Sequence, residues 1–272
     1  MKIYVMTDME GVAGTFEYDS PRNKNFNFAF KRLRWGSFLT REVNAAVEAL
    51  LSVGIGDITV CDGHGPGDLL DLEKINPEVK AIVGKKRISW LPAFNSSFDA
   101  LLFIGSHAME GIHAGTLSHT YSRRTIKNFS LNNKILGEIG ITAALAGYHS
   151  VPFIFISGDK AAIGEAREYV PNIYSVCVKE GISTQCTKTI HIKKSENLIK
   201  TEVIKSIKNY KSIDTFRIDP PFKLVVRYKR ASVALYKWLR KKSNRPKFAW
   251  PNKLVFSHQN DLDILLKRFK EV

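Results

Sequence analysis

The chain has 272 residues, 44% of them hydrophobic and 25% charged, which is enough to bury a core in one large domain or two small ones. No run of about 18 apolar residues occurs, so no transmembrane helix is predicted. The start of the chain lacks a signal-peptide pattern. Three cysteines without CxxC spacing indicate neither a disulfide framework nor a cysteine zinc site. The three cysteines are therefore expected to be reduced thiols, which predicts a cytoplasmic protein.

The formal net charge of +15 raises the question of an acidic partner, such as nucleic acid or an anionic membrane surface. The basic residues are spread widely, although several gather late, at residues 240–242, Arg245 and Lys247. No RNA-binding signature or low-complexity basic tail accompanies them. We therefore interpret the charge as a solvated surface and expect neither nucleic acid nor a membrane as a partner.

Short apolar runs alternate with helical patterns over the first part of the chain. Strands are expected over residues 3–6, 57–61, 81–84, 98–105 and 151–156. Helices are expected over residues 35–53, 138–146 and 161–169. Asn132 and Asn133 separate two short strands and predict a hairpin turn. Alternating strands and helices predict an α/β fold whose mostly parallel sheet is flanked by helices.

Beyond Pro171 the pattern changes. Strands are expected over residues 172–178 and 223–228, and helices over residues 196–210, 231–239 and 260–269. These segments predict a smaller C-terminal α+β lobe that would build subunit contacts. The predicted division is an α/β domain over residues 1–170 and this lobe over residues 171–272.

Side chains that commonly bind metals follow the ends of the predicted strands. Asp8 and Glu10 point to the same side of an extended backbone, and they repel each other unless a proton or a cation lies between them. If these two residues are considered alone, the alternative to a metal site is that Asp8 caps a helix and Glu10 is a solvated carboxylate. His64 and His107 follow two further strands, and Glu138 begins a helix. Because strand ends meet at one edge of a parallel sheet, the five residues form a ligand set for one or two zinc ions or related metals.

Four other polar residues have simpler interpretations. Asp62 could orient a ligand histidine or cap its own turn, and the sequence leaves both open. Asp159 is an N-cap by default, with a direct functional role as the less favoured alternative. His191 and His258 are isolated and are interpreted as surface or structural histidines.

Five short motifs stand out in chain order: Asp8-Met9-Glu10-Gly11, Asp62-Gly63-His64, Gly105-Ser106-His107-Ala108, Ser118-His119 and Gly137-Glu138-Ile139-Gly140. Together they resemble the dipeptide D-aminopeptidase family of binuclear zinc peptidases. They stand in the family's order with similar gaps and cover roughly residues 1–170. The C-terminal lobe resembles the family only loosely, and its Lys-rich segments are the clearest departure.

The resemblance implies two zinc ions per chain, with other divalent metals as an alternative. Asp8 would bridge the two ions, and His119 would be the catalytic histidine beside the metals rather than a ligand. The residues that complete the two coordination shells would be Glu10, His64, His107 and Glu138. His113 is a weaker candidate for the task of His119 and is more simply a loop histidine.

The activity implied by the resemblance is release of N-terminal D-amino acids from short peptides by metal-activated water, in a homo-oligomer that is a decamer of stacked pentameric rings. Two other functions stay open from the residues themselves. One is a different binuclear metal hydrolase, such as an amidase or a phosphoesterase. The other is a non-catalytic basic binding protein with a structural metal. The choice between D- and L-substrates depends on pocket shape, which the sequence does not disclose.

Overall fold

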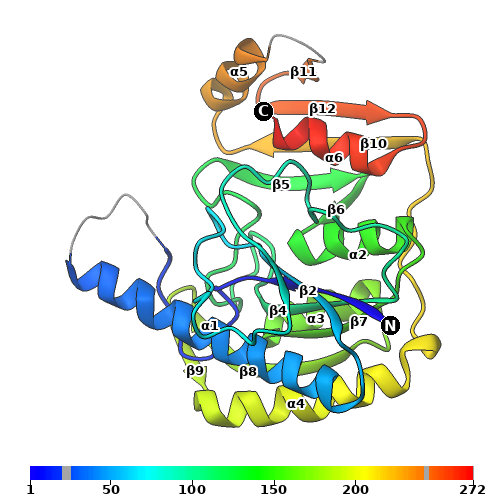
Figure 1. Ribbon diagram of the computed structural model, residues 1–272. Helices are drawn as coiled ribbons and strands as arrows, with labels where there is room; N and C mark the ends of the chain where they lie inside the picture. Colours follow the sequence, from blue (N-terminus) through cyan, green and yellow to red (C-terminus); the bar gives the residue numbers. More distant parts are fainter. Residues whose placement is uncertain (20–25, 242–244, 272) are drawn as a thin grey trace.

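The computed structural model describes residues 1–19, 26–241 and 245–271, and it contains two β-sheets (Figure 1). The first sheet has seven strands in the order β3-β2-β1-β4-β7-β8-β9. These strands are β1 (Lys2–Thr7), β2 (Asp57–Asp62), β3 (Lys80–Ile82), β4 (Ala100–Ser106), β7 (Phe153–Asp159), β8 (Tyr174–Ser183) and β9 (Cys186–Thr189). All neighbours pair in parallel except β9, which is antiparallel to β8.

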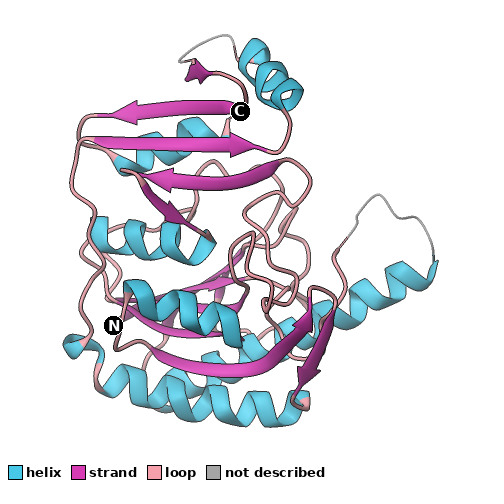
Figure 2. Cartoon of the chain, turned by 180° about the vertical axis from the view of Figure 1, so that it is seen from behind, coloured by secondary structure: helices cyan, strands magenta, loops and turns pink. Residues whose placement is uncertain are grey.

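Helices cover both faces of this sheet (Figures 1 and 2). α1 (Phe26–Ser52) and α4 (Ile192–Lys208) pack against each other on one face. On the other face lie α2 (Glu138–Tyr148) and α3 (Lys160–Tyr169). The residues that α1 buries recur at intervals of three and four, as expected for one helix face; they include Leu39, Val43, Ala46 and Leu50. The predicted α/β architecture with a mostly parallel sheet is confirmed.

The helix expected over residues 35–53 begins earlier than predicted, at Phe26. Its first turns bury Phe28, whose ring meets the ring of Trp35 edge-on at 5.8 Å. Phe30 and Leu33 in the same turns stay exposed. The apolar spacing is therefore too irregular in this part to indicate a helix from sequence.

The second sheet is antiparallel and has the strand order β11-β12-β10-β5-β6. Its strands are β5 (Ile126–Leu131), β6 (Lys134–Leu136), β10 (Phe222–Tyr228), β11 (Lys247–Ala249) and β12 (Lys253–His258). The predicted hairpin is confirmed, because Asn132 and Asn133 connect β5 to β6 with φ of 47° and 68°, as both central residues of a type I′ turn require. α5 (Ala231–Arg240) and α6 (Leu262–Lys270) pack on this sheet, and the 3₁₀ turn Tyr210–Ser212 follows α4.

β9, β11 and β12 were not expected from the sequence. β9 is short and mostly exposed, with the sequence CTKT, so it carries little of the alternating pattern on which strand prediction depends. The division into residues 1–170 and 171–272 stays a prediction. Each sheet draws strands from both sides of residue 170: β8 and β9 extend the first sheet, while β5 and β6 pair in the second.

The carboxyl ends of three central strands lie at the same edge of the first sheet. β1 lies between β2 and β4, with Thr7 paired to Asp62 on one side and to Ile104 on the other. The residues that follow these strand ends are therefore neighbours in space. Across this part of the molecule, α6 packs on β10 and β12 and also contacts α2. None of the described helices is long and apolar enough to cross a membrane.

Candidate metal centre

The turn after β1 packs backbone against backbone on the end of β4. The amide of Asp8 donates to the carbonyl of Ile104 at 2.9 Å, and the amide of Gly11 donates to the carbonyl of Gly105 at 2.7 Å. Gly105 has a φ of 75°, and the pairing of β4 with β7 is irregular there, as at a β-bulge. A Cβ atom on Gly11 would lie 1.8 Å from the carbonyl oxygen of Ser106. Only glycine allows this approach.

A buried lysine holds the loop that follows Glu10. Lys179, on β8, donates from Nζ to the carbonyl oxygens of Glu10, Val12 and Thr15, the last at 2.7 Å, and also to Thr15 Oγ1 at 2.7 Å. Burial lowers the pKa of Lys179 to about 8. The ammonium group thus gathers carbonyl oxygens that would otherwise be unpaired. Lys179 was not singled out from the sequence, because nothing local distinguishes it from the many other lysines.

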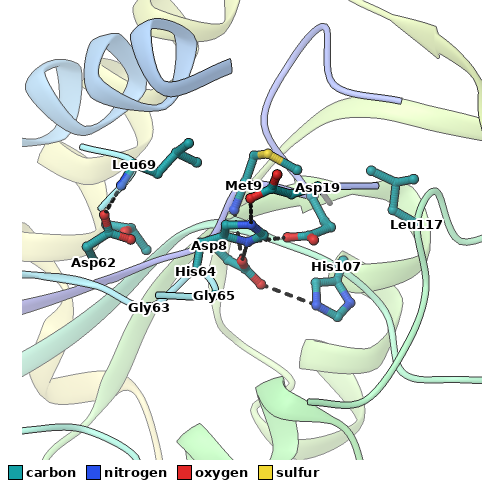
Figure 3. Close-up of polar contacts among 12 residues, drawn as sticks. Asp8, Met9, Asp19, Asp62, Gly63, His64, Gly65, Leu69, His107 and Leu117 are labelled. Carbon is teal, nitrogen blue, oxygen red and sulfur yellow. Dashed lines mark hydrogen bonds and ion pairs between the residues drawn. The ribbon is translucent and has the colours of Figure 1, made fainter. Parts of the chain in front are cut away.

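Asp8 lies between two imidazole rings (Figure 3). Its Oδ1 is 2.9 Å from Nδ1 of His64, and its Oδ2 is 3.2 Å from Nε2 of His107. Glu10 Oε2 is also 2.9 Å from Nδ1 of His64. On the other side of the cluster, Nε2 of His107 lies 3.5 Å from Oε1 of Glu138. The five sequence-predicted ligands are therefore neighbours in the structure.

Backbone groups fix the orientation of two of these side chains. His107 donates from Nδ1 to the carbonyl of Ala108 at 2.9 Å, which leaves Nε2 facing the carboxylates. Glu138 is the first residue of α2, and its Oε1 accepts from the amide of Tyr121 at 2.7 Å. A carboxylate at a helix N-terminus is stabilised by the helix dipole.

The charges of the cluster depend on one another. Burial would raise the pKa of Asp8, but hydrogen bonds and charge from His107 and His64 hold it well below its usual range. Burial would likewise lower the pKa of His64, but Glu10, Asp19 and Asp8 raise it well above its usual range. Asp8 therefore stays ionised and draws positive charge to the site.

The residues present fit a divalent cation. Glu10 Oε2 and His107 Nε2 are buried, and each faces an oppositely charged group without a hydrogen bond of good geometry. One hydrogen on Nδ1 of His64 cannot serve both Asp8 and Glu10, whereas a cation between them can. Ligand atoms of Asp8, Glu10 and His107 lie within 4.8 Å of one another, and so do those of His107, His119 and Glu138. Carboxylate and imidazole ligands in this number suit zinc.

His119 lies directly against the cluster. Its ring stacks on that of His107, with 4.2 Å between centroids and 8° between planes, and the ring of Tyr18 meets it edge-on at 6.0 Å. Nδ1 donates to the carbonyl of Leu117 at 2.9 Å, so Nε2 is available as an acceptor. The geometry thus allows His119 either as a ligand beside Glu138 or as a proton carrier next to the ligands.

Two aspartates have structural roles at the strand ends. Asp62 accepts from the amides of Leu69 and Leu70 at 2.7 and 3.0 Å and points away from His107 (Figure 3), so it caps its loop. Asp159 is the N-cap of α3, as expected, and accepts from the amide of Ala162 at 2.8 Å. Its second oxygen accepts from the amide of Thr116 at 2.5 Å and so holds the loop that leads to His119.

The remaining histidines lie outside the centre, and one missed aspartate lies in it. His113 is exposed. His191 caps α4, and Nδ1 of His258 accepts from the amide of Asp261; both are structural, as expected. Asp19 Oδ2 is 3.2 Å from Nε2 of His64 and thereby orients that ring. Asp19 follows no strand and belongs to no pattern, so the sequence carries no signal for it.

The chain is similar to known D-aminopeptidases. A family model described as D-aminopeptidase matches residues 1–243. A curated D-aminopeptidase of Bacillus subtilis (strain 168) is 28% identical over 239 residues, which are 88% of this chain and 84% of that protein. The fold matches that of the Zn-dependent D-aminopeptidase DppA from Bacillus subtilis, a self-compartmentalizing protease, with a TM-score of 0.87 and 24% identity. That match covers 100% of this chain and 95% of the other.

We expect Gly11→Ala to lower the metal content of the purified protein, because the new methyl group must displace the carbonyl of Ser106 and with it the turn that carries Glu10. The strain should cost about 1–3 kcal/mol. Gly56→Ala is the control, since its Cβ would meet nothing within 4 Å. Metal counted per chain by elemental analysis, together with thermal unfolding, checks the prediction. Equal metal content in the two variants would contradict it.

Proposed function

The chain belongs to the D-aminopeptidase family, and on that premise we propose that it is a zinc-dependent aminopeptidase that releases N-terminal D-amino acids from short peptides. The observation that carries the proposal is the cluster formed by Asp8, Glu10, His64, His107 and Glu138. The cluster opens into a cavity of about 770 Å³, a size common for small-ligand sites. The zinc dependence and the substrate class are those in the names of the relatives.

We propose two zinc ions per chain, with Asp8 as the ligand they share. The support is the direction of its two oxygens, because Oδ1 faces His64 and Oδ2 faces His107. Glu10 adjoins His64 on one side, and Glu138 adjoins His107 on the other. Each half of the cluster thus offers one imidazole, one carboxylate of its own and one oxygen of Asp8.

Bound zinc supplies a water of lowered pKa and offsets negative charge on the scissile carbonyl oxygen. His119 moves the proton: Nε2 accepts one from the attacking water and returns it to the leaving amine. The carbonyl of Leu117 holds Nδ1–H, and the ring of His107 supports one face of the imidazole. Zinc held by these residues would also bind the free amino group of the substrate, which would favour a free N-terminus in the pocket.

Metal removal tests the activity directly. We expect exhaustive chelation to abolish hydrolysis and added Zn²⁺ to restore it, with about two zinc ions per chain. Paired D-alanyl and L-alanyl dipeptides are compared at equal concentration, and the D-form should be cleaved faster. Full activity without metal would overturn the zinc dependence, and preference for the L-form would overturn the stereochemistry. A phosphomonoester and a simple amide in the same panel test the alternative of another binuclear hydrolase.

His119→Ala should lower kcat about 10²–10⁴-fold while the zinc content stays as in the wild type. His113→Ala, an exposed histidine of the same loop, is the matched control and should leave kcat unchanged. Loss of one zinc ion from His119→Ala would instead make His119 a ligand. An unchanged kcat would remove it from the mechanism.

We propose that the chain assembles as a decamer of stacked pentameric rings in the cytoplasm. The support for self-assembly is the description of the structural relative as self-compartmentalizing. The support for the location is that Cys61, Cys177 and Cys186 are all free thiols. Light scattering should give a particle far above the chain mass of 30.7 kDa. A monomer would contradict the assembly.

A further inference from the structure

The cavity above the metal centre has a floor of metal-binding side chains and a cationic wall. The cluster residues on its floor are Asp8, Glu10, His64 and Glu138. Its wall carries six cationic side chains, which come from three separate parts of the chain: Lys85, Lys86, Arg87, Arg123, Arg124 and Lys270. Part of the net charge that the sequence assigned to a solvated surface thus lines the pocket.

None of these six cations lies within 4.0 Å of a carboxylate oxygen of the described residues. Two acidic residues of the pocket rim do have partners elsewhere. Glu271 pairs with Lys241 at 2.6 Å, and Asp19 pairs with Arg32 at 3.0 Å. The six wall cations therefore have no ion-pair partner among the described residues.

Arg87 and Lys270 are the two wall cations that are partly buried, and the other four are exposed. Arg87 donates to the carbonyls of Gly63 and Gly65, both at 2.8 Å, which fixes the guanidinium without neutralising it. Lys270, at the end of α6, holds Nζ over the rings of Trp90 and Tyr121, at 5.1 and 4.7 Å from their centroids. These contacts hold both charges in place.

The two cations act on each other. Burial, followed by the charge of Arg87, lowers the pKa of Lys270 to about 8, while the charge of Glu138 opposes this shift. A pair of partly buried like charges without a counter-ion is unfavourable. An anion bound between them would offset that cost, and the cavity is the space from which an anion can reach Lys270. The family model ends at residue 243, so α6 and Lys270 lie beyond the matched range.

We propose that Arg87 and Lys270 bind a carboxylate of the substrate, so that the enzyme selects short peptides carrying a negative charge away from the N-terminal residue. This inference rests on the proposed peptidase function. The carboxylate comes either from the C-terminus of the peptide or from an acidic side chain. In both cases the peptide lies with its amino group at the metal centre and its carboxylate toward the wall.

The test compares a D-alanyl dipeptide that has a free C-terminal carboxylate with the same dipeptide as its amide. The metal-loaded wild type should prefer the carboxylate form by about tenfold or more in kcat/KM, mainly through KM. Lys270→Met keeps the length of the side chain and its contact with the rings, and it should remove most of that preference. Lys270→Arg should retain it.

Lys267→Met is the matched control, since Lys267 is exposed on the same helix and does not line the cavity. It should preserve the preference for the carboxylate form. Two further dipeptides, D-alanyl-glutamate and D-alanyl-glutamine, both with an amidated C-terminus, separate the two sources of the carboxylate. Tighter binding of the glutamate form supports a side-chain carboxylate, and equal binding of the two assigns the site to the C-terminus.

Calorimetric binding of the carboxylate and amide dipeptides is measured on the metal-loaded His119→Ala variant, because turnover by the wild type would consume the peptides during the titration. We expect the affinities to differ by about tenfold in this variant and to become similar when Lys270→Met is added. Equal affinities in His119→Ala, or an unchanged difference after Lys270→Met is added, would overturn the carboxylate site. Failure of the wild type to cleave any D-alanyl peptide would count against the peptidase function instead, while the binding result still decides the subsite.

Discussion

Negative charge gathered at one edge of the sheet is the constraint on which the rest of the structure depends. Asp8 and Glu10 are buried, and Glu138 adjoins them through His107. Ionised carboxylates so close together are unstable without positive charge between them. Two imidazoles already lie in that position, and bound zinc would satisfy the same need with ligands that it favours. The chemistry of the site follows from this need for positive charge.

A few features of the backbone bring these carboxylates together. β1 lies between β2 and β4, so the segments after three strands meet at one edge. Glycine at position 11 lets the turn after β1 approach the bulged end of β4 more closely than any side chain would allow. Lys179, which lies on β8, donates hydrogen bonds to backbone carbonyls of the loop that follows this turn. The ligands are therefore set by packed backbone rather than by flexible side chains, and the site is preorganised.

The pocket joins this metal-binding floor to a cationic wall. Arg87 connects the two, because it donates to the carbonyls on either side of His64 while its charge faces the cavity. A peptide whose amino group lies at the floor can meet the wall with its carboxylate. Such complementarity contributes to orientation and selectivity more than to affinity. It also gives the strongly basic composition a role at the site that does not require nucleic acid or a membrane.

The sequence by itself determined the alternation of strands and helices, the Asn132–Asn133 hairpin and the set of residues that gather at the metal centre. It could do so because strand and helix periods are local, and because parallel strands bring their carboxyl ends to one edge. Only the tertiary structure decided that β5 and β6 pair with β10 and that α1 begins at Phe26. The tertiary structure alone also decided where Asp19, Lys179 and Lys270 lie, because no sequence motif distinguishes them. Lys179 meets Glu10 across 169 positions of sequence, and such contacts arise from packing, which no local pattern records.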